Sequence, residues 1–167
     1  MRLNNSVIKF IVVVTFMVFV IVKVQRVFAW NTNAPSSSVL IFTSFSMPKE
    51  SLRGWLKQAD TIKAPVIIRG LINNSFRDTT KAVMELLPDN RGGFQLDPTL
   101  FRRFHIEKVP AVVVITPTCL SNPACQEADI VYGDVTLDYA LKEIIKQNDS
   151  LTPYAQEALK KLTEQGI

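Results

Sequence analysis

Three short runs of mainly apolar, β-branched residues constrain the fold most, because each has the length of a strand rather than of a helix. Between them, apolar residues recur every three or four positions, which is the spacing of one helix face. Strands that are apolar throughout are typical of a sheet covered on both faces. The sequence therefore predicts an α/β chain with a central sheet. The three runs occupy 39–42, 66–71 and 111–115.

The turns before the first two predicted helices contain residues that start helices. Ser46 can cap the first helix, and Pro48 fits its first turn. The second helix follows a turn at 73–75. We expect its apolar residues to point toward the core. They are Phe76, Val83, Met84 and Leu87.

Three further helices are predicted in the second half of the chain. Asp97 precedes a proline, a pattern typical of a helix start. Apolar residues form a clear helical stripe over 137–145, where Asp138 and Lys142 are spaced for an ion pair. A last helix is predicted from Thr152 onward.

The first 29 residues have the pattern of a secretory signal. Basic residues precede an apolar run at 10–22, and small residues allow cleavage between Ala29 and Trp30. An uncleaved membrane anchor is the alternative, although the apolar run is shorter than the roughly 20 residues that span a bilayer. In both cases the remainder is exported, so we expect a periplasmic protein that touches the membrane only through an uncleaved leader.

These patterns divide the chain into four predicted parts. Ser, Asn and Pro are frequent between the leader and the first strand, which indicates a flexible entry to the fold. The four parts are a signal peptide at 1–29, a linker at 30–38, a folded domain at 39–148 and a C-terminal helical tail at 149–167.

The basic residues of the leader account for the whole formal net charge of +4. Without them, the exported part has equal numbers of basic and acidic side chains. A neutral chain has no electrostatic footprint for a phosphate backbone, so we expect no nucleic-acid partner. The leader residues concerned are Arg2, Lys9, Lys23 and Arg26.

Two cysteines lie in the exported part, Cys119 and Cys125. An even number of cysteines in an oxidising compartment favours a disulfide, and the Asn-Pro pair between them indicates a turn-rich loop. A structural disulfide is our first interpretation, with a reactive couple or a metal-binding pair as alternatives. Because His105 is the chain's single histidine, a Cys/His zinc site would have too few ligands. We expect no metal and no cofactor.

The predicted order of elements combines parallel strand-helix-strand units with a terminal hairpin. Val109-Pro110 enters the third strand, and in thioredoxin-like folds a cis-proline stands at this place. The chain thus resembles a thioredoxin-like three-layer fold, with a central mixed sheet flanked by helices. The resemblance implies a cis bond before Pro110, although X-Pro bonds are usually trans.

No catalytic group is predicted where a thioredoxin carries its two cysteines. Ser46, Met47 and Pro48 occupy that place, and without a thiolate there is no nucleophile for disulfide exchange. No G-x-S-x-G elbow surrounds Ser46, so acyl transfer is not expected either. The sequence predicts a protein that is not an enzyme.

A binding groove is the remaining candidate for a functional site. Strand ends in α/β sheets face the crevice where ligands bind, and Arg69 and Gly70 end the second predicted strand. The alternative interpretation is that Arg69 pairs with a carboxylate and Gly70 relieves a tight turn. Our hypothesis is a groove that holds a protein segment, formed by Ser46, Met47, Pro48, Arg69, Gly70 and Pro110.

Several motifs in order along 39–145 resemble the F-type TrbC family. This resemblance implies a periplasmic assembly protein of an F-type conjugative type IV secretion system, required for pilus formation. It also implies a TraW-like partner and contacts with other conjugative secretion components. The alternative is a periplasmic thiol-disulfide or chaperone protein of the thioredoxin superfamily. The motifs are Phe-Ser-Met-Pro at 45–48, Ile-Arg-Gly-Leu at 68–71, Gln-Leu-Asp-Pro-Thr-Leu-Phe at 95–101, Val-Pro-Ala-Val-Val at 109–113 and Tyr-Gly-Asp-Val at 132–135.

Overall fold

The three apolar runs form the centre of a five-stranded mixed sheet in the computed structural model, which describes residues 37–87, 93–147 and 149–165. The strand order is β3-β2-β1-β4-β5. β1, β2 and β3 run parallel, β4 is antiparallel to β1, and β5 is antiparallel to β4. The strands are β1 Val39–Thr43, β2 Val66–Ile68, β3 Phe94–Leu96, β4 Ala111–Val114 and β5 Asp129–Tyr132.

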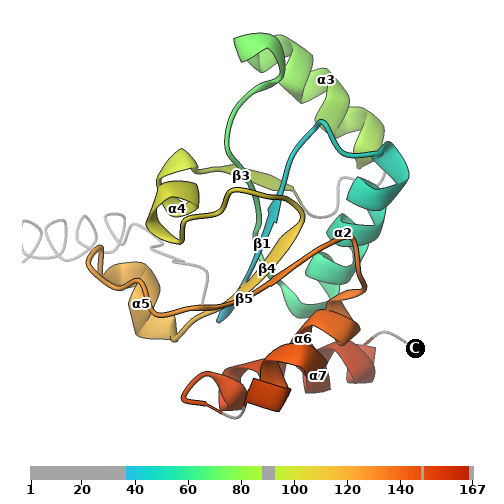
Figure 1. Cartoon of the computed structure of the whole chain (residues 1–167). Helices are drawn as coiled ribbons and strands as arrows, with labels where there is room; N and C mark the ends of the chain where they lie inside the picture. The colour runs from blue at the N-terminus through green and yellow to red at the C-terminus, as the bar shows by residue number, and fades with distance from the viewer. Residues whose placement is uncertain (1–36, 88–92, 148, 166–167) are drawn as a thin grey trace, which may run out of the picture. The chain divides into compact units, whose positions relative to one another are not determined.

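Helices cover both faces of this sheet, so the described residues form three layers. Figure 1 shows α2, α6 and α7 on one side of the strands and α4 and α5 on the other. This arrangement is consistent with the thioredoxin-like fold that the sequence predicts. The helices are α2 Lys49–Ile62, the short 3-10 helix η1 Ile72–Asn74, α3 Phe76–Leu86, α4 Pro98–Arg103, α5 Pro117–Ser121, α6 Leu137–Gln147 and α7 Thr152–Gln165.

Successive side chains of the strands point to opposite faces of the sheet and pack into two separate cores. On the α2 side, Ile41 and Val112 pack with residues such as Trp55 and Leu141. On the opposite side, Phe42 packs edge-on against Phe101, with 4.8 Å between the ring centroids. Both faces of the central strands are therefore buried, as continuous apolar strands require.

α7 shares the first of these two cores. Leu151, Ala155 and Ala158 are buried among the side chains of that cluster, and the helix contacts α6, α2 and β1. The last described helix therefore contributes to the stability of the α2 side of the sheet.

One strand and one short helix lie outside the sequence prediction. β3 has only three residues, Phe94–Leu96, and forms by pairing with β2. α5 includes Cys119, in a segment predicted as loop. Both elements are too short to produce a recognisable hydrophobic period.

The predicted inward face of α3 is wrong. Phe76 and Met84 are 74% and 67% exposed, whereas Thr79 and Leu86 are the buried residues of the helix. Val83 and Leu87 are partly buried. α3 has an apolar face, but the helix packs through one side of it, at Leu86 and Thr79, so Phe76 and Met84 on the other side of that face are exposed.

In the described part of the chain, no helix has the length and apolar character needed to cross a membrane. The predicted signal peptide, its cleavage point between Ala29 and Trp30, and most of the linker at 30–38 lie outside the described residues.

Candidate functional site

At one end of the sheet, where β1 and β2 finish and β4 begins, lie the segments that the sequence analysis identified as candidates. Thr43 at the end of β1 pairs with Ile68 at the end of β2, and Phe42 pairs with Ala111 at the start of β4. The segments that follow β1 and β2, and the residue before β4, therefore meet at this end. We call it the groove edge and define it as residues 44–48, 69–73 and Pro110.

The start of α2 at the groove edge differs from the prediction. α2 begins at Lys49, Pro48 is its N-cap, and no side chain caps it. The prediction that Ser46 caps the helix is wrong because the Ser46 hydroxyl lies 2.9 Å from the Ser44 hydroxyl, which also accepts a hydrogen bond from the Ser46 N–H. These two serines order the turn before the helix, and no thiol is present in this turn.

A shallow hollow of about 330 Å³ lies at the groove edge. Ser46 and Gly70 line it together, so these two predicted residues share one surface. Met47 instead packs against the α2-side core, and Pro110 is buried. The other residues that line the hollow are Ser44, Phe45, Leu71, Ile72 and Asn73.

Arg69 turns away from the hollow. Its guanidinium donates to the backbone carbonyl of Ile106 at 3.0 Å and lies 5.2 Å from the centre of the Phe101 ring. Within the described ranges, no carboxylate lies within 4 Å of Arg69, so the expected ion pair is not found there. Arg69 fixes the segment after α4 against the end of β2.

Gly70 has no conformational need for glycine. Its φ lies outside the left-handed region, and a Cβ added to it would have no atom within 4 Å. The interpretation that Gly70 relieves a tight turn is therefore wrong. Its small size instead leaves the hollow open.

The peptide bond between Val109 and Pro110 is cis. The Pro110 carbonyl accepts a hydrogen bond from Gly133 N–H at 3.0 Å, which joins the start of β4 to the end of β5. Pro110 therefore connects the groove edge to the loop that leads into α6.

Asp134, in that loop, is a structural centre that sequence reasoning missed. One of its carboxylate oxygens accepts hydrogen bonds from Ser51 Oγ at 2.8 Å and from Trp55 Nε1 at 3.0 Å. Trp55 is only 2% exposed, so this bond satisfies a buried donor. The signal available in the sequence was the Gly133-Asp134 pair, but its partners lie about 80 positions earlier on α2.

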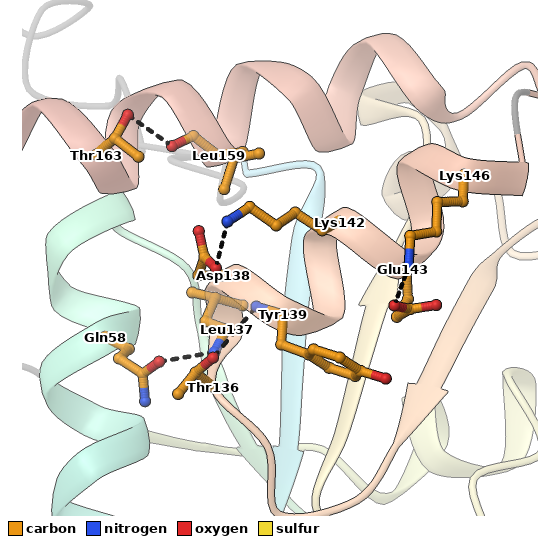
Figure 2. A network of polar contacts seen from close by, with 10 residues as sticks. All are labelled: Gln58, Thr136, Leu137, Asp138, Tyr139, Lys142, Glu143, Lys146, Leu159 and Thr163. Atoms are coloured by element: carbon orange, nitrogen blue, oxygen red, sulfur yellow. Dashed lines mark hydrogen bonds and ion pairs between the residues drawn. The ribbon is translucent and has the colours of Figure 1, made fainter.

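α2 also contacts the start of α6. Gln58 Oε1 accepts from the backbone N–H of Leu137 at 2.7 Å, and Thr136 Oγ1 accepts from Tyr139 N–H at 3.2 Å. Figure 2 shows Gln58 reaching from α2 to the first turn of α6. The helix also carries the expected pair of Asp138 and Lys142, at 2.8 Å. α2 and α6 are therefore fixed to each other by polar contacts as well as by the core.

Cys119 and Cys125 form a disulfide at the end of the sheet that lies opposite the groove edge. α5, which holds Cys119, follows the carboxyl end of β4, and that end pairs with Val39 at the start of β1. The two sulfurs are thus separated from the start of α2 by the length of the sheet.

Arg103 at the end of α4 organises the disulfide loop. Its Nε donates to the Cys125 carbonyl at 2.7 Å, and its Nη2 contacts the carbonyls of Cys119 and Asn122. Its guanidinium also lies 5.3 Å from the centre of the Phe104 ring. A planar group with several fixed donors suits such convergent carbonyls. No pattern in the sequence predicted this contact.

Three carboxyl groups meet near the turn between α6 and α7. Burial, followed by the neighbouring Asp149 and Glu127, raises the pKa of Asp129 to about 6. One Asp129 oxygen is buried without a hydrogen-bond partner in the described structure. Ser150 Oγ donates to Glu127 at 2.7 Å, and Asp149 accepts from Leu151 N–H at 2.8 Å. Burial and the neighbouring carboxyl groups therefore disfavour the ionised form of Asp129.

Across residues 37–87, 93–147 and 149–165, no group of three or more His, Cys, Asp or Glu side chains is arranged to hold a metal ion. The groove edge offers hydroxyl and backbone groups and apolar side chains.

The fold and this edge define a class: a thioredoxin-like three-layer arrangement in which the start of α2 has no thiol. Residues 41–144 match the family described as "Type-F conjugative transfer system pilin assembly protein". The chain belongs to this family, the F-type TrbC family.

A curated relative supports the same assignment. The chain is 33% identical over 127 residues to "Periplasmic protein TrbC" of Escherichia coli strain K12. The alignment covers 75% of this chain and 56% of the relative, so the chain spans just over half the length of that protein. No solved structure matches the chain.

Proposed function

We propose that this protein is exported to the periplasm and acts there as a non-catalytic assembly factor for an F-type conjugative pilus. The family match over residues 41–144 carries the proposal, because it extends from within β1 into α6 and thus includes at least part of every strand of the sheet. The periplasmic location follows the name of the relative from Escherichia coli and the predicted signal peptide.

The proposal that the protein is non-catalytic depends on the two places where thioredoxin chemistry could reside. The turn before α2 has serines and a proline where a reactive thiol would stand. The chain's two cysteines are joined to each other at the far end of the sheet. A disulfide held away from the groove edge serves stability rather than exchange with a bound substrate.

Contact with another protein is the role that we propose for the groove edge. The hollow between Ser46 and Gly70 is open, and the cis-proline Pro110 belongs to the same end of the sheet. An extended segment of a partner can lie there against hydroxyl and backbone groups. A TraW-like periplasmic protein of the same secretion system is the partner that we propose, with other conjugative secretion components as further contacts.

The first experiment is affinity capture of the tagged mature chain from the periplasm of a conjugating host that carries a deletion of the native gene. We expect the expressed chain to restore pili, to begin at Trp30 and to be recovered with a TraW-like protein. Pili that form equally well without the chain would contradict the assembly role. Recovery as mixed disulfides with many secreted proteins would contradict the non-catalytic role.

Gly70 provides a matched pair of variants for the groove edge. Because its Cβ position is open, Gly70→Trp fills the hollow without strain in the backbone, and Gly70→Ala leaves it almost unchanged. We expect Gly70→Trp to reduce partner recovery at least tenfold and Gly70→Ala to have no effect. Equal recovery with both variants would exclude the hollow as the contact.

A further inference from the structure

α3 presents an exposed stripe with apolar side chains that the described residues leave uncovered. Phe76, Thr80 and Met84 are four positions apart and therefore lie along one side of the helix. Phe76 is 74% exposed and Met84 is 67% exposed. We call these three residues the α3 stripe. Large apolar side chains gathered at an exposed site are characteristic of interaction surfaces.

The helix that bears the stripe is fixed by polar contacts on its other sides. Ser75 caps it by accepting from Asp78 N–H at 3.2 Å, and Thr79 Oγ1 accepts from Ile72 N–H at 2.9 Å. At its far end, Glu85 pairs with Lys49 of α2 at 2.7 Å. Figure 1 shows α3 beyond the end of the sheet, beside the start of α2. The stripe is thus held outward rather than folded onto the core.

A row of three charged residues borders the stripe. Arg77, Lys81 and Glu85 follow Phe76, Thr80 and Met84 by one position each, and all three are exposed. Glu85 is paired with Lys49 of α2, whose hydrogen bond and charge lower its pKa. Among the described residues, no carboxylate lies within 4 Å of Arg77 or Lys81. The border therefore offers two cations to a partner, whereas its carboxylate is already neutralised by Lys49.

We propose that the α3 stripe docks an amphipathic helix of another protein, whose apolar side chains cover Phe76 and Met84 and whose carboxylates face Arg77 and Lys81. An apolar helix face laid against another, with complementary charges at the rim, is a common mode of recognition. A second copy of this chain fits less well, because it brings the same two cations to the surface, and the one carboxylate in its row, Glu85, is already paired with Lys49. The inference rests on the proposed function only in the choice of cell for the test.

The test is site-specific photo-crosslinking of the full chain in conjugating cells. A crosslinking amino acid replaces Thr80, which lies within the stripe, or Thr163, which is exposed on α7. We expect position 80, and not position 163, to give one discrete adduct. Peptide mapping should place the crosslink on a segment with apolar residues at helical spacing and Glu or Asp beside them.

Charge reversal makes this test specific. We expect R77E/K81E to reduce the position-80 adduct at least tenfold, and replacement of the mapped carboxylates by lysine to restore it. The matched control is K57E/K108E, which reverses two exposed cations away from α3 and should leave the adduct unchanged.

Three results would overturn the proposal: adducts of equal yield at both positions, an adduct with a second copy of the chain, or an adduct indifferent to R77E/K81E. Pilus formation is scored separately. An acidic helical adduct in cells whose pili do not require the chain would contradict the proposed function and leave the docking site standing.

Discussion

Single side chains join elements of this fold that are far apart in the sequence. Asp134 accepts hydrogen bonds from Ser51 and from the buried indole of Trp55, both on α2. Arg69 joins the end of β2 to the segment after α4 through the Ile106 carbonyl. Each is a polar residue at the end of a strand, where one hydrogen-bonded group can fix two segments at once.

Replacing Asp134 by alanine should lower the free energy of unfolding by about 1–3 kcal/mol, because the buried indole N–H of Trp55 would lose its acceptor. Asp134→Asn keeps an acceptor oxygen and should retain most of the stability. Urea denaturation of the variants measures both effects. Asp138→Ala removes an exposed carboxylate of similar size and should cost about 0.5 kcal/mol or less. Equal losses for Asp134→Ala and Asp138→Ala would show that the indole contact contributes nothing.

The raised pKa of a second single residue, Asp129, predicts that the stability of the fold depends on pH. Its pKa of about 6 in the folded chain exceeds the ordinary value of about 3.9 for an aspartate in an unfolded chain. The folded state therefore holds this proton more strongly, and the associated stability is full below about pH 4 and lost as the pH rises through 6. Asp129→Asn removes this loss, since an amide stays neutral.

We expect Asp129→Asn to be more stable than the native chain at pH 7.5 by about 1 kcal/mol, an effect reduced by partial exposure to solvent. The advantage should shrink toward pH 4.5. Urea unfolding of both proteins at the two pH values measures the difference. A constant difference across this range would mean that Asp129 titrates normally in the folded chain.

The elements show which parts of the fold a sequence can predict. β1, β2 and β4 were predictable because short runs that are apolar throughout are typical of strands buried on both faces. β3 was not, since Phe94–Leu96 has one half-buried and two exposed residues and depends on its pairing with β2. For α3, periodicity identified the helix but not the packed face. That choice depends on the contact of Thr79 with η1 and of Glu85 with α2.

The candidate site was predictable only in part. The run of Ser46, Met47 and Pro48 marked the start of α2 and the missing thiol, and register brought Gly70 to the same hollow as Ser46. Asp134 was not predictable as a contact, because its partners on α2 are identified only by the path of the chain through the sheet.

The disulfide element should add a modest stability. In the chain-entropy model, closing so short a loop stabilises a fold by about 2 kcal/mol. We therefore expect the free energy of unfolding of the double variant Cys119→Ala, Cys125→Ala, measured by urea denaturation, to be lower by that amount. Its circular dichroism should remain native. The native protein treated with reductant is the matched control and should approach the same midpoint. A double variant that cannot fold would mean that the bridge does more than close the loop.

At the scale of the whole molecule, stability is concentrated on the α2 side of the sheet. Leu151, Ala155 and Ala158 of the α7 region lie in the same core cluster as Trp55 and Leu141. The C-terminal helix is therefore part of the fold, and the chain cannot be shortened at residue 148 without opening that core.

A chain ending at residue 148 should lose of the order of 10 °C in thermal midpoint, because it exposes apolar surface of α2 and α6. A chain ending at residue 161 keeps Leu151, Ala155 and Ala158 and should lose less than half as much. Differential scanning calorimetry of the three chains measures this. Equal midpoints for the full chain and the chain ending at 148 would show that α7 packs without stabilising.

Arg103 gives the disulfide loop a second means of support. Its guanidinium gathers the carbonyls of Cys119, Asn122 and Cys125, so polar contacts hold the loop together with the bond between the sulfurs. Loss of that bond would therefore leave Arg103 to hold the two cysteine backbones near each other.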